Sequence, residues 1–313
     1  MLRYIARRLI ATIPVMAVVA VAVFSMLRLT TGDPAAIIAG DNATSADVTA
    51  IRAKLGLDRP IVEQFGIWIG RILRGDLGES FFFKKQVAEL IVERLEPTIA
   101  LAVCTIVLAV LMAVPLGVTA AWKRGTWIDR VVMGFSVLGF SVPVFVVGYL
   151  LIYLFAIQLA WLPVQGYQRF REGVGGFLRH LVLPSFTLAV ILVALIARIT
   201  RASVLEVLNA DHVRTARAKG LAELSVLARH VLRNAAVPIV TVIGLGVALL
   251  IGGVVVTESV YAIPGVGRLT VDAVLARDYP TVQAVILVFS AVYVLINLLV
   301  DLTYTFLDPR IRY

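Results

Sequence analysis

The sequence predicts an all-α membrane protein with six transmembrane helices, and three observations lead to this fold class. Hydrophobic residues make up 60% of the chain and charged residues 16%, whereas soluble domains hold about 45–50% and about 25%. Six apolar runs reach the length of about 20 residues that crosses a hydrocarbon core. The net charge of +9 is concentrated in the segments on one side of these runs. Together they predict a multi-pass protein.

The six runs can be read directly from the sequence. They are Leu9–Leu29, Ile99–Trp122, Val131–Ile157, Leu181–Ile199, Ile239–Ser259 and Val282–Phe306. The fourth has Pro184 and Ser185 near its start. The first follows Arg3, Arg7 and Arg8, as in a signal peptide, but it exceeds an h-region of about 7–15 residues and no clear A-x-A site follows. We therefore interpret it as a retained span.

Six spans put both termini on one side, and the basic residues indicate which side that is. Short loops and span ends rich in Lys and Arg face the cytoplasm, whereas long loops cross the membrane regardless of charge. The long polar segment Thr30–Pro97 is then outside, and the basic stretch after the fourth run is inside. We expect both termini in the cytoplasm. The basic excess follows from topology, so it gives no reason to expect nucleic acid as a partner.

This topology divides the chain into three parts. Residues 1–29 form the N-terminus and first span, residues 30–98 an extracytoplasmic helical segment, and residues 99–313 a five-helix core containing a cytoplasmic loop, 203–237. In the outer segment we expect helices over Ser45–Leu55, after Pro60 and over Gln86–Leu95, the last with one apolar face. Two interpretations stay open for this segment: helices lying on the membrane surface, or a docking platform for an external partner.

The loop 203–237 has the pattern of two helices separated by a glycine. The first places Leu205, Leu208, Val213 and Ala216 on one face, and the second Leu224, Leu227, Val231 and Ala235. Gly220 suits the left-handed position after a helix end, with Leu221 as the apolar residue that often accompanies it.

The surface at this bend is narrow and basic. Ala216 and Ala218 are small, while Arg214, Arg217 and Lys219 supply donors. A solvated loop obeying the positive-inside rule would be basic too, but it would need neither paired amphipathic helices nor a small-residue tip. A protein-docking surface is the alternative.

Sequence signs of catalysis are absent. No G-x-x-x-x-G-K-[ST] phosphate loop occurs, so any energy from ATP must enter through a partner. His180, His212 and His230 lie apart without ligand spacing, and the single Cys104 suits packing, so we assign no metal, cofactor or catalytic residue. No acid or histidine lies near a span midplane, which argues against a secondary carrier.

Ten motifs in order carry a resemblance to a known family over nearly the full length. They are GDPA (32–35), LGLDRPI (55–61), RGDLGES (74–80), SVPVFV (141–146), HLVLPSFTLA (180–189), RTARAKGL (214–221), RHVLRNAAVPIV (229–240), ESVYAIPGVGRL (258–269), ARDYPTVQA (276–284) and DPRIRY (308–313). The chain resembles a membrane-spanning permease subunit of a bacterial ABC importer, of the dipeptide/oligopeptide/nickel family.

The resemblance implies a type I importer fold in the bacterial inner membrane and a set of partners. These are a second homologous permease, two cytoplasmic ATPase subunits that bind ATP and Mg, and an extracytoplasmic substrate-binding protein. It implies that a coupling helix in the loop contacts the ATPase, through Arg214, Thr215, Ala216, Arg217, Ala218, Lys219, Gly220 and Leu221. The family's EAA-x-x-x-G motif is incomplete here, because Arg214 replaces the glutamate and Thr215 the first alanine, while Ala216 and Gly220 match. The substrate would be a di- or oligopeptide, with nickel or glutathione as alternatives.

Overall fold

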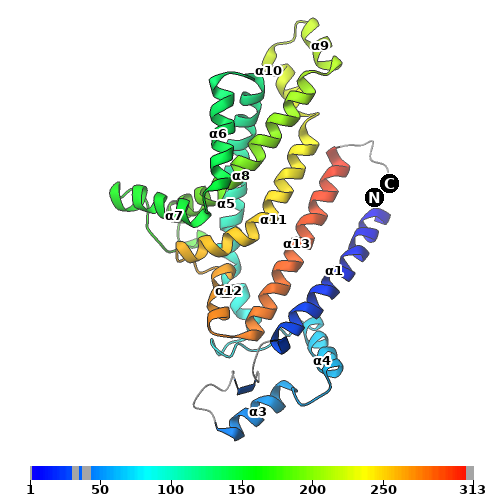
Figure 1. The fold of residues 1–313 in the computed structure, drawn as a ribbon, viewed down its shortest axis with the longest axis vertical. Coiled ribbons are helices and arrows are strands. Elements are labelled where there is room, and N and C mark those ends of the chain that lie inside the picture. Colours follow the sequence, from blue (N-terminus) through cyan, green and yellow to red (C-terminus); the bar gives the residue numbers. More distant parts are fainter. Residues whose placement is uncertain (1, 30–34, 37–43, 308–313) are drawn as a thin grey trace. The chain divides into compact units, whose positions relative to one another are not determined.

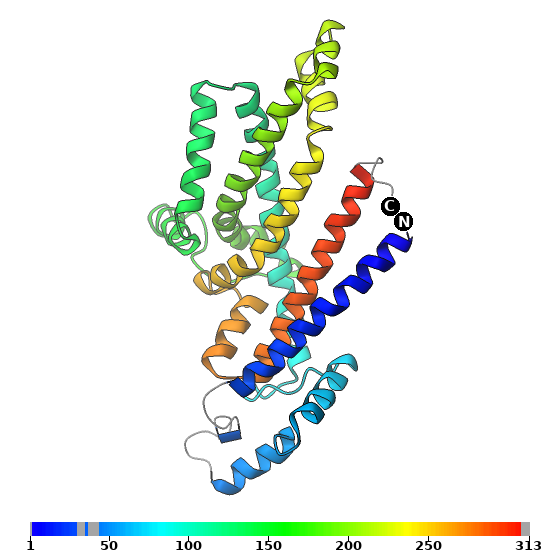
Figure 2. The ribbon, with the colours of Figure 1, turned by 45° about the vertical axis from the view of Figure 1, so that its right-hand side comes forward.

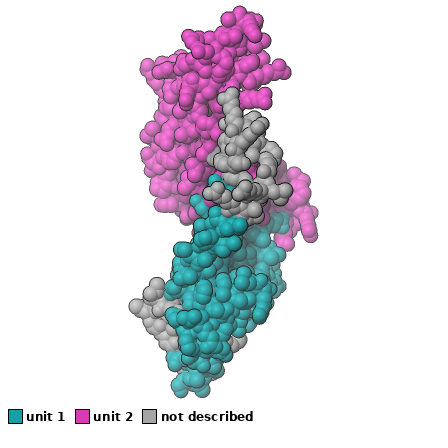
Figure 3. Space-filling view, turned by 90° about the vertical axis from the view of Figure 1, so that its right-hand side faces the viewer, with its two compact units in different colours: residues 1–96, 265–295 teal, residues 97–264, 296–313 magenta. Residues whose placement is uncertain are grey.

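The computed structural model describes residues 2–29, 35–36 and 44–307, and regular structure there is almost entirely helical. The first three residues of GDPA and all of DPRIRY lie outside the described residues. Figures 1 and 2 show the helices from two directions. The chain forms two compact units: residues 1–96 with 265–295, and residues 97–264 with 296–313, coloured separately in Figure 3.

Unit 1 contains most of the polar outer segment expected from the sequence. Its elements are α1 (Leu2–Leu29), α3 (Ser45–Leu55), α4 (Ile61–Leu73), the first turns of α5 (Val87–Trp122), α12 (Val266–Leu275) and the first half of α13 (Tyr279–Leu307). The helix over Ser45–Leu55 is confirmed, and Pro60 caps α4 as expected. The helix expected over Gln86–Leu95 is the beginning of the long α5, which continues through Pro97.

The apolar face predicted near the start of α5 forms a core of unit 1. Val87, Leu90 and Ile91 are buried, with Leu95 packed partly against them. Their partners come from α12 and α13 and are Val266, Leu269, Ala284 and Val285. A second cluster joins α1, α4 and α13 through Val23, Trp68 and Leu287. Helices far apart in the sequence therefore share one core.

Unit 2 is built around the long, mostly buried helix α8 (Val174–Leu208). The other elements are the rest of α5, α6 (Trp127–Ser141), α7 (Val144–Leu151), the π-helix η1 (Ile152–Gln158), the 3-10 turn η2 (Phe170–Glu172), α9 (Asp211–Ala218), α10 (Glu223–Ser225), the π-helix η3 (Val226–Leu232), α11 (Ala236–Val260) and the end of α13. Helix α8 packs against α6, α7 and α11.

The predicted third span is wrong as one continuous helix. The run Val131–Ile157 is divided between α6 and α7–η1, which meet at 106°. Val142 is extended, with φ −94° and ψ 125°, and Pro143 caps α7. A residue before proline avoids the helical region because the proline ring clashes with it, so the helix must end here. The apolar run was therefore identified correctly, but it forms two helices joined by a sharp bend.

The other apolar runs form long helices. Among the described residues, α5, α8, α11 and Tyr279–Thr303 of α13 are long and apolar enough to cross a membrane, and the bent pair could supply a fifth span. Helix α1 has a shorter apolar part, Ile10–Met26. In α8 the helix continues on both sides of the buried Pro184 and extends well beyond the predicted Leu181–Ile199. Neighbouring helices make such a proline tolerable within a span.

Candidate functional site

The loop 203–237 forms a helical hairpin at one end of unit 2. Helix α8 ends at Leu208, α9 follows after a break at Asn209–Ala210, and α10 continues into η3 before α11 begins. Helices α9 and α10 lie beyond that end of α8 and α11 (Figures 1 and 2). Leu205 and Leu208 therefore belong to α8, and the expected first helix starts later, at Asp211. The helix–glycine–helix arrangement itself is confirmed.

Gly220 makes the bend between the two helices. Its φ is +75°, which costs a glycine little but strains other residues. The Gly220 amide donates to the Arg217 carbonyl at 2.9 Å, and the Leu221 amide donates to the Ala216 carbonyl at 3.4 Å. The second bond reaches back five residues, as in a Schellman helix end. The structure therefore confirms the predicted left-handed conformation of Gly220.

An apolar cluster holds the hairpin together and joins it to the bundle. Val213 and Ala216 of α9 are buried against η3, where Val226, Leu227 and Val231 are buried too. The cluster continues into the spans through Ala121, Val204, Ala235 and Ile239. The Ala216 side chain is 5% exposed, so it packs inside the hairpin rather than on its outer surface.

One residue of the predicted second face is wrong. Leu224 is 77% exposed, whereas Val226 is fully buried in its place. The prediction assumed a uniform period of 3.6 residues, but residues 226–232 form a π-helix, whose hydrogen bonds reach back five residues. Val226 and Val231, five apart, therefore face the same way, and Leu224 is left on the surface.

Two of the three predicted cations are held within the loop. Arg214 pairs with Asp211 on the same helix. Arg217 donates to both carboxylate oxygens of Glu223, at 2.6 and 3.2 Å, across the Gly220 bend. This hydrogen bonding raises the pKa of Arg217 above its usual value. The forked pair helps to fix the angle between α9 and α10, since two parallel bonds constrain orientation as well as distance.

The outer surface of the bend combines one cation with two leucines. Ala218, Lys219, Leu221 and Leu224 are exposed, and within the described residues Lys219 forms no ion pair. Thr215 is exposed, and its hydroxyl donates to the Asp211 carbonyl at 3.0 Å. The two exposed leucines and Lys219 give the bend a surface that is partly apolar and partly basic. The structure thus brings all eight predicted residues together in one hairpin, with seven at its surface.

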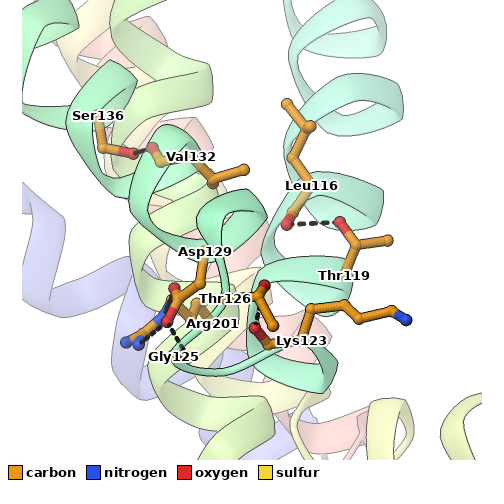
Figure 4. A network of polar contacts seen from close by, with 9 residues as sticks. All are labelled: Leu116, Thr119, Lys123, Gly125, Thr126, Asp129, Val132, Ser136 and Arg201. Atoms are coloured by element: carbon orange, nitrogen blue, oxygen red, sulfur yellow. Dashed lines mark hydrogen bonds and ion pairs between the residues drawn. The ribbon is translucent and has the colours of Figure 1, made fainter.

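A partly buried ion pair near the C-terminal end of α8 was not predicted (Figure 4). The Asp129 carboxylate, 5% exposed, accepts bonds from the Arg201 guanidinium at 2.5 and 2.8 Å. It also accepts the Gly125 amide at 3.0 Å. This links the α5–α6 turn, the start of α6 and the last turns of α8. One signal for this pair was present in the sequence: Asp129 is an acid among basic residues at the end of a span. Such an acid needs a partner if it is buried.

A second buried polar network lies in unit 1 and joins two of the quoted motifs. Asp278, 1% exposed, accepts hydrogen bonds from the hydroxyls of Ser80 and Thr281 at 2.5 and 2.7 Å, and from the Phe81 amide at 3.2 Å. Ser80 also accepts the Phe83 amide at 2.8 Å. RGDLGES and ARDYPTVQA therefore meet through Ser80 and Asp278, a pairing that sequence reasoning missed.

No cluster of three or more His, Cys, Asp or Glu side chains able to hold a metal ion occurs in the part of the chain that the structure describes. Two of the buried carboxylates, Asp129 and Asp278, form ion pairs or hydrogen bonds that join separate segments of the chain. Their arrangement supports a structural role for these side chains.

Comparison with protein families assigns the chain to a class. Residues 113–313 match the binding-protein-dependent transport system inner membrane component, and residues 1–102 match the N-terminal part of such membrane components. The chain belongs to this family. It is a multi-pass inner-membrane permease of an ABC transport system, which implies ATPase and binding-protein partners. This excludes a secondary carrier or a stand-alone channel.

Curated relatives match over almost the whole chain. The "Probable peptide ABC transporter permease protein y4tP" of Sinorhizobium fredii is 55% identical over 310 residues, 99% of both chains. The glutathione transport system permease protein GsiC of Escherichia coli O6:H1 is 44% identical over 313 residues, 100% of both.

Two solved structures share the fold at low sequence identity. The inward-facing MetNI methionine ABC transporter matches with a TM-score of 0.58 and 18% identity, over 70% of this chain and 96% of that one. An amino acid ABC transporter crystallised with histidines matches with a TM-score of 0.50 and 17% identity, over 71% and 94%. At this identity the likeness shows the fold alone, and it confirms the predicted ABC importer permease fold.

Proposed function

We propose that this chain is the permease subunit of an importer for di- and oligopeptides and forms half of the translocation pathway beside a second homologous permease. The full-length identity of 55% to a relative named as a peptide permease supports this substrate class. Glutathione, itself a tripeptide, is the second candidate, supported by the relatives named as glutathione permeases. Nickel is a third, implied only by the earlier resemblance.

In this proposal two cytoplasmic ATPase subunits bind and hydrolyse ATP with Mg, and one contacts the hairpin of this chain. The eight residues Arg214–Leu221 form the coupling segment, with Leu224 as an additional contact. Three features support it: the Schellman bend at Gly220, the ion pair across it and the exposed leucines. A hairpin packed onto the bundle through its own apolar cluster can transmit movement to α8 and α11.

The orientation of the chain in the membrane is part of the same proposal. Both termini and the hairpin face the cytoplasm, and residues 30–98 face outward, where they meet the substrate-binding protein. The basic hairpin satisfies the positive-inside preference of short loops. The division into 1–29, 30–98 and 99–313 describes this topology and stays a prediction.

Retention of the ATPase by a surface variant tests the coupling site. Leu224→Asp places a charge on the proposed contact without disturbing the buried cluster, so we expect the purified permease complex to retain clearly less ATPase subunit than the wild-type complex. Leu275→Asp is the matched control, because Leu275 is 79% exposed in α12, which the proposed topology puts outside. Full retention by Leu224→Asp would refute the proposed contact.

Ligand identification tests the substrate class. Mass spectrometry of small molecules that co-purify with the partner binding protein should find peptides of mixed sequence. Glutathione or nickel as the sole ligand would replace the peptide assignment with that alternative.

A further inference from the structure

Arg198 is an exposed basic residue within the long membrane helix α8. Its guanidinium carbon lies 5.4 Å from the centre of the Phe140 ring in α6. It forms no ion pair with any carboxylate among the described residues. Nearby, Arg201 is paired with Asp129. The two arginines of α8 therefore differ, because Arg201 has a carboxylate partner within the described residues and Arg198 has none.

The contact with Phe140 places the Arg198 charge inside the bilayer rather than at its edge. Asp129 marks the end of α6 at the hairpin side, and eleven residues of helix separate it from Phe140, a rise of about 16 Å. Helical side chains lean toward the N-terminus of their helix, which for α8 is the end remote from the hairpin. Arg198 therefore reaches away from the basic loop and toward the Phe140 ring, which leans the opposite way along α6. Its charge lies further from the hairpin than the Arg201–Asp129 pair.

A charge at this depth is costly unless it faces water or protein. Ionisable residues in spans face a bundle interior or an aqueous cavity, and they mark substrate pathways. Glu258, near the C-terminal end of α11, is fully buried and bonded to the Thr98 hydroxyl at 2.6 Å. Arg198 instead presents its charge on the surface of this subunit.

The Phe140 ring positions the guanidinium and leaves hydrogen-bonding capacity. A cation over an aromatic face is attracted by the ring quadrupole, which uses no N–H donor. The planar guanidinium keeps its N–H fork, whose geometry matches a carboxylate with two parallel bonds. The Arg198 guanidinium is thus suited to bind a carboxylate reversibly.

We propose that Arg198 lines the translocation pathway and binds the carboxylate of the passing peptide. This inference rests on the peptide permease function proposed above. Peptides of mixed sequence share their backbone and charged termini, so a group that recognises the C-terminal carboxylate can serve all of them. Phe140 acts as the positioning residue that holds the guanidinium toward the pathway.

Uptake by the reconstituted complex with its binding protein tests this role. The probe is a pool of di- to hexapeptides, with internalised peptides measured by mass spectrometry. Loss of a charge-assisted bond of about 1.5–3 kcal/mol predicts that Arg198→Gln lowers kcat/KM for uptake about 10- to 100-fold. Arg198→Lys should recover part of it.

Arg130→Gln is the matched control, since Arg130 is an exposed arginine in the first turn of α6, and it should transport normally. Unchanged uptake in Arg198→Gln, or equal loss in both variants, would overturn the inference. If the wild-type complex takes up no peptide, the proposed function fails instead, so the two failures are distinguishable.

Thiol labelling provides an independent readout of position. In a chain whose one cysteine is replaced (Cys104→Ala), Arg198→Cys should react with anionic sulfonatoethyl methanethiosulfonate in the assembled complex. Saturating peptide pool, binding protein and a non-hydrolysable ATP analogue should slow the reaction several-fold. No reaction in any state would place Arg198 against the second permease, and a reaction insensitive to peptide would place it outside the pathway. Either result contradicts the proposal.

Discussion

The hairpin and the Asp278 network use polar groups in opposite ways. Around Asp278 the carboxylate and both bonded hydroxyls are buried, and the bonds from Ser80 and Phe81 join segments far apart in sequence. In the hairpin, the ion pairs Arg214–Asp211 and Arg217–Glu223 are substantially exposed, and each is local in sequence. The hairpin is held to the helix bundle by apolar packing. The first arrangement fixes structure, whereas the second leaves a polar surface that a partner can contact.

The two arrangements also differ in the free energy that is lost when one partner is removed. A buried group that loses its partner bears its full desolvation penalty, whereas exposed ion pairs contribute about 0–1 kcal/mol. Substitutions in unit 1 should therefore affect stability, and those in the hairpin should affect coupling.

The largest expected effect comes from removing the buried carboxylate. Asp278→Ala leaves the Ser80 and Thr281 hydroxyls and the Phe81 amide without their acceptor, so we expect a loss of about 3 kcal/mol or more in unfolding free energy. Denaturation of the detergent-solubilised permease by increasing SDS, followed by tryptophan fluorescence, measures it. Asp211→Ala removes an exposed carboxylate and should shift the curve little. Equal shifts in the two variants would contradict the comparison.

At Gly220 we expect a smaller effect on stability and a larger effect on transport. Gly220→Ala forces a side chain into the left-handed region, at a cost of about 1–2 kcal/mol, and disturbs the angle between α9 and α10. ATP hydrolysis should continue while peptide uptake per ATP falls. Gly75, with φ +83° and open space around its Cα, provides the control. Gly75→Ala carries a similar backbone cost and should leave the ratio of uptake to hydrolysis unchanged.

The smallest stability effect is expected for the pair across the bend. Arg217→Gln should change the unfolding free energy by less than about 1 kcal/mol, because the pair is partly exposed to solvent. Its uptake should nevertheless fall, and rising salt should narrow the difference from wild type by screening the native pair. Uptake assays in proteoliposomes at two ionic strengths measure this. A variant that loses several kcal/mol would show that the pair is structural.

Much of the fold could be predicted because helical and apolar periods are local properties. The bounds of Ser45–Leu55, the apolar face starting at Val87 and the left-handed Gly220 all follow from short-range patterns. The motif order predicted the family, which the family comparison confirmed.

The remaining features depend on geometry that a local pattern does not contain. The 106° angle between α6 and α7–η1 depends on how these helices pack, which the apolar run alone does not specify. Leu224 was misplaced because a π-helix changes the period. The Asp129–Arg201 and Ser80–Asp278 bonds join residues remote in sequence, and nothing local specifies such pairs. The direction of the Arg198 side chain emerged only from its contact with Phe140 in another helix.

Site-directed crosslinking tests the central claim that the hairpin contacts the ATPase. In the Cys104→Ala background, a photoactivatable maleimide probe is attached to Leu224→Cys or Lys219→Cys in the assembled complex, with Leu275→Cys as control. We predict a crosslinked species containing the ATPase subunit from both hairpin positions and none from Leu275→Cys. Absence of that species from both hairpin positions in an ATPase-containing complex would contradict the account.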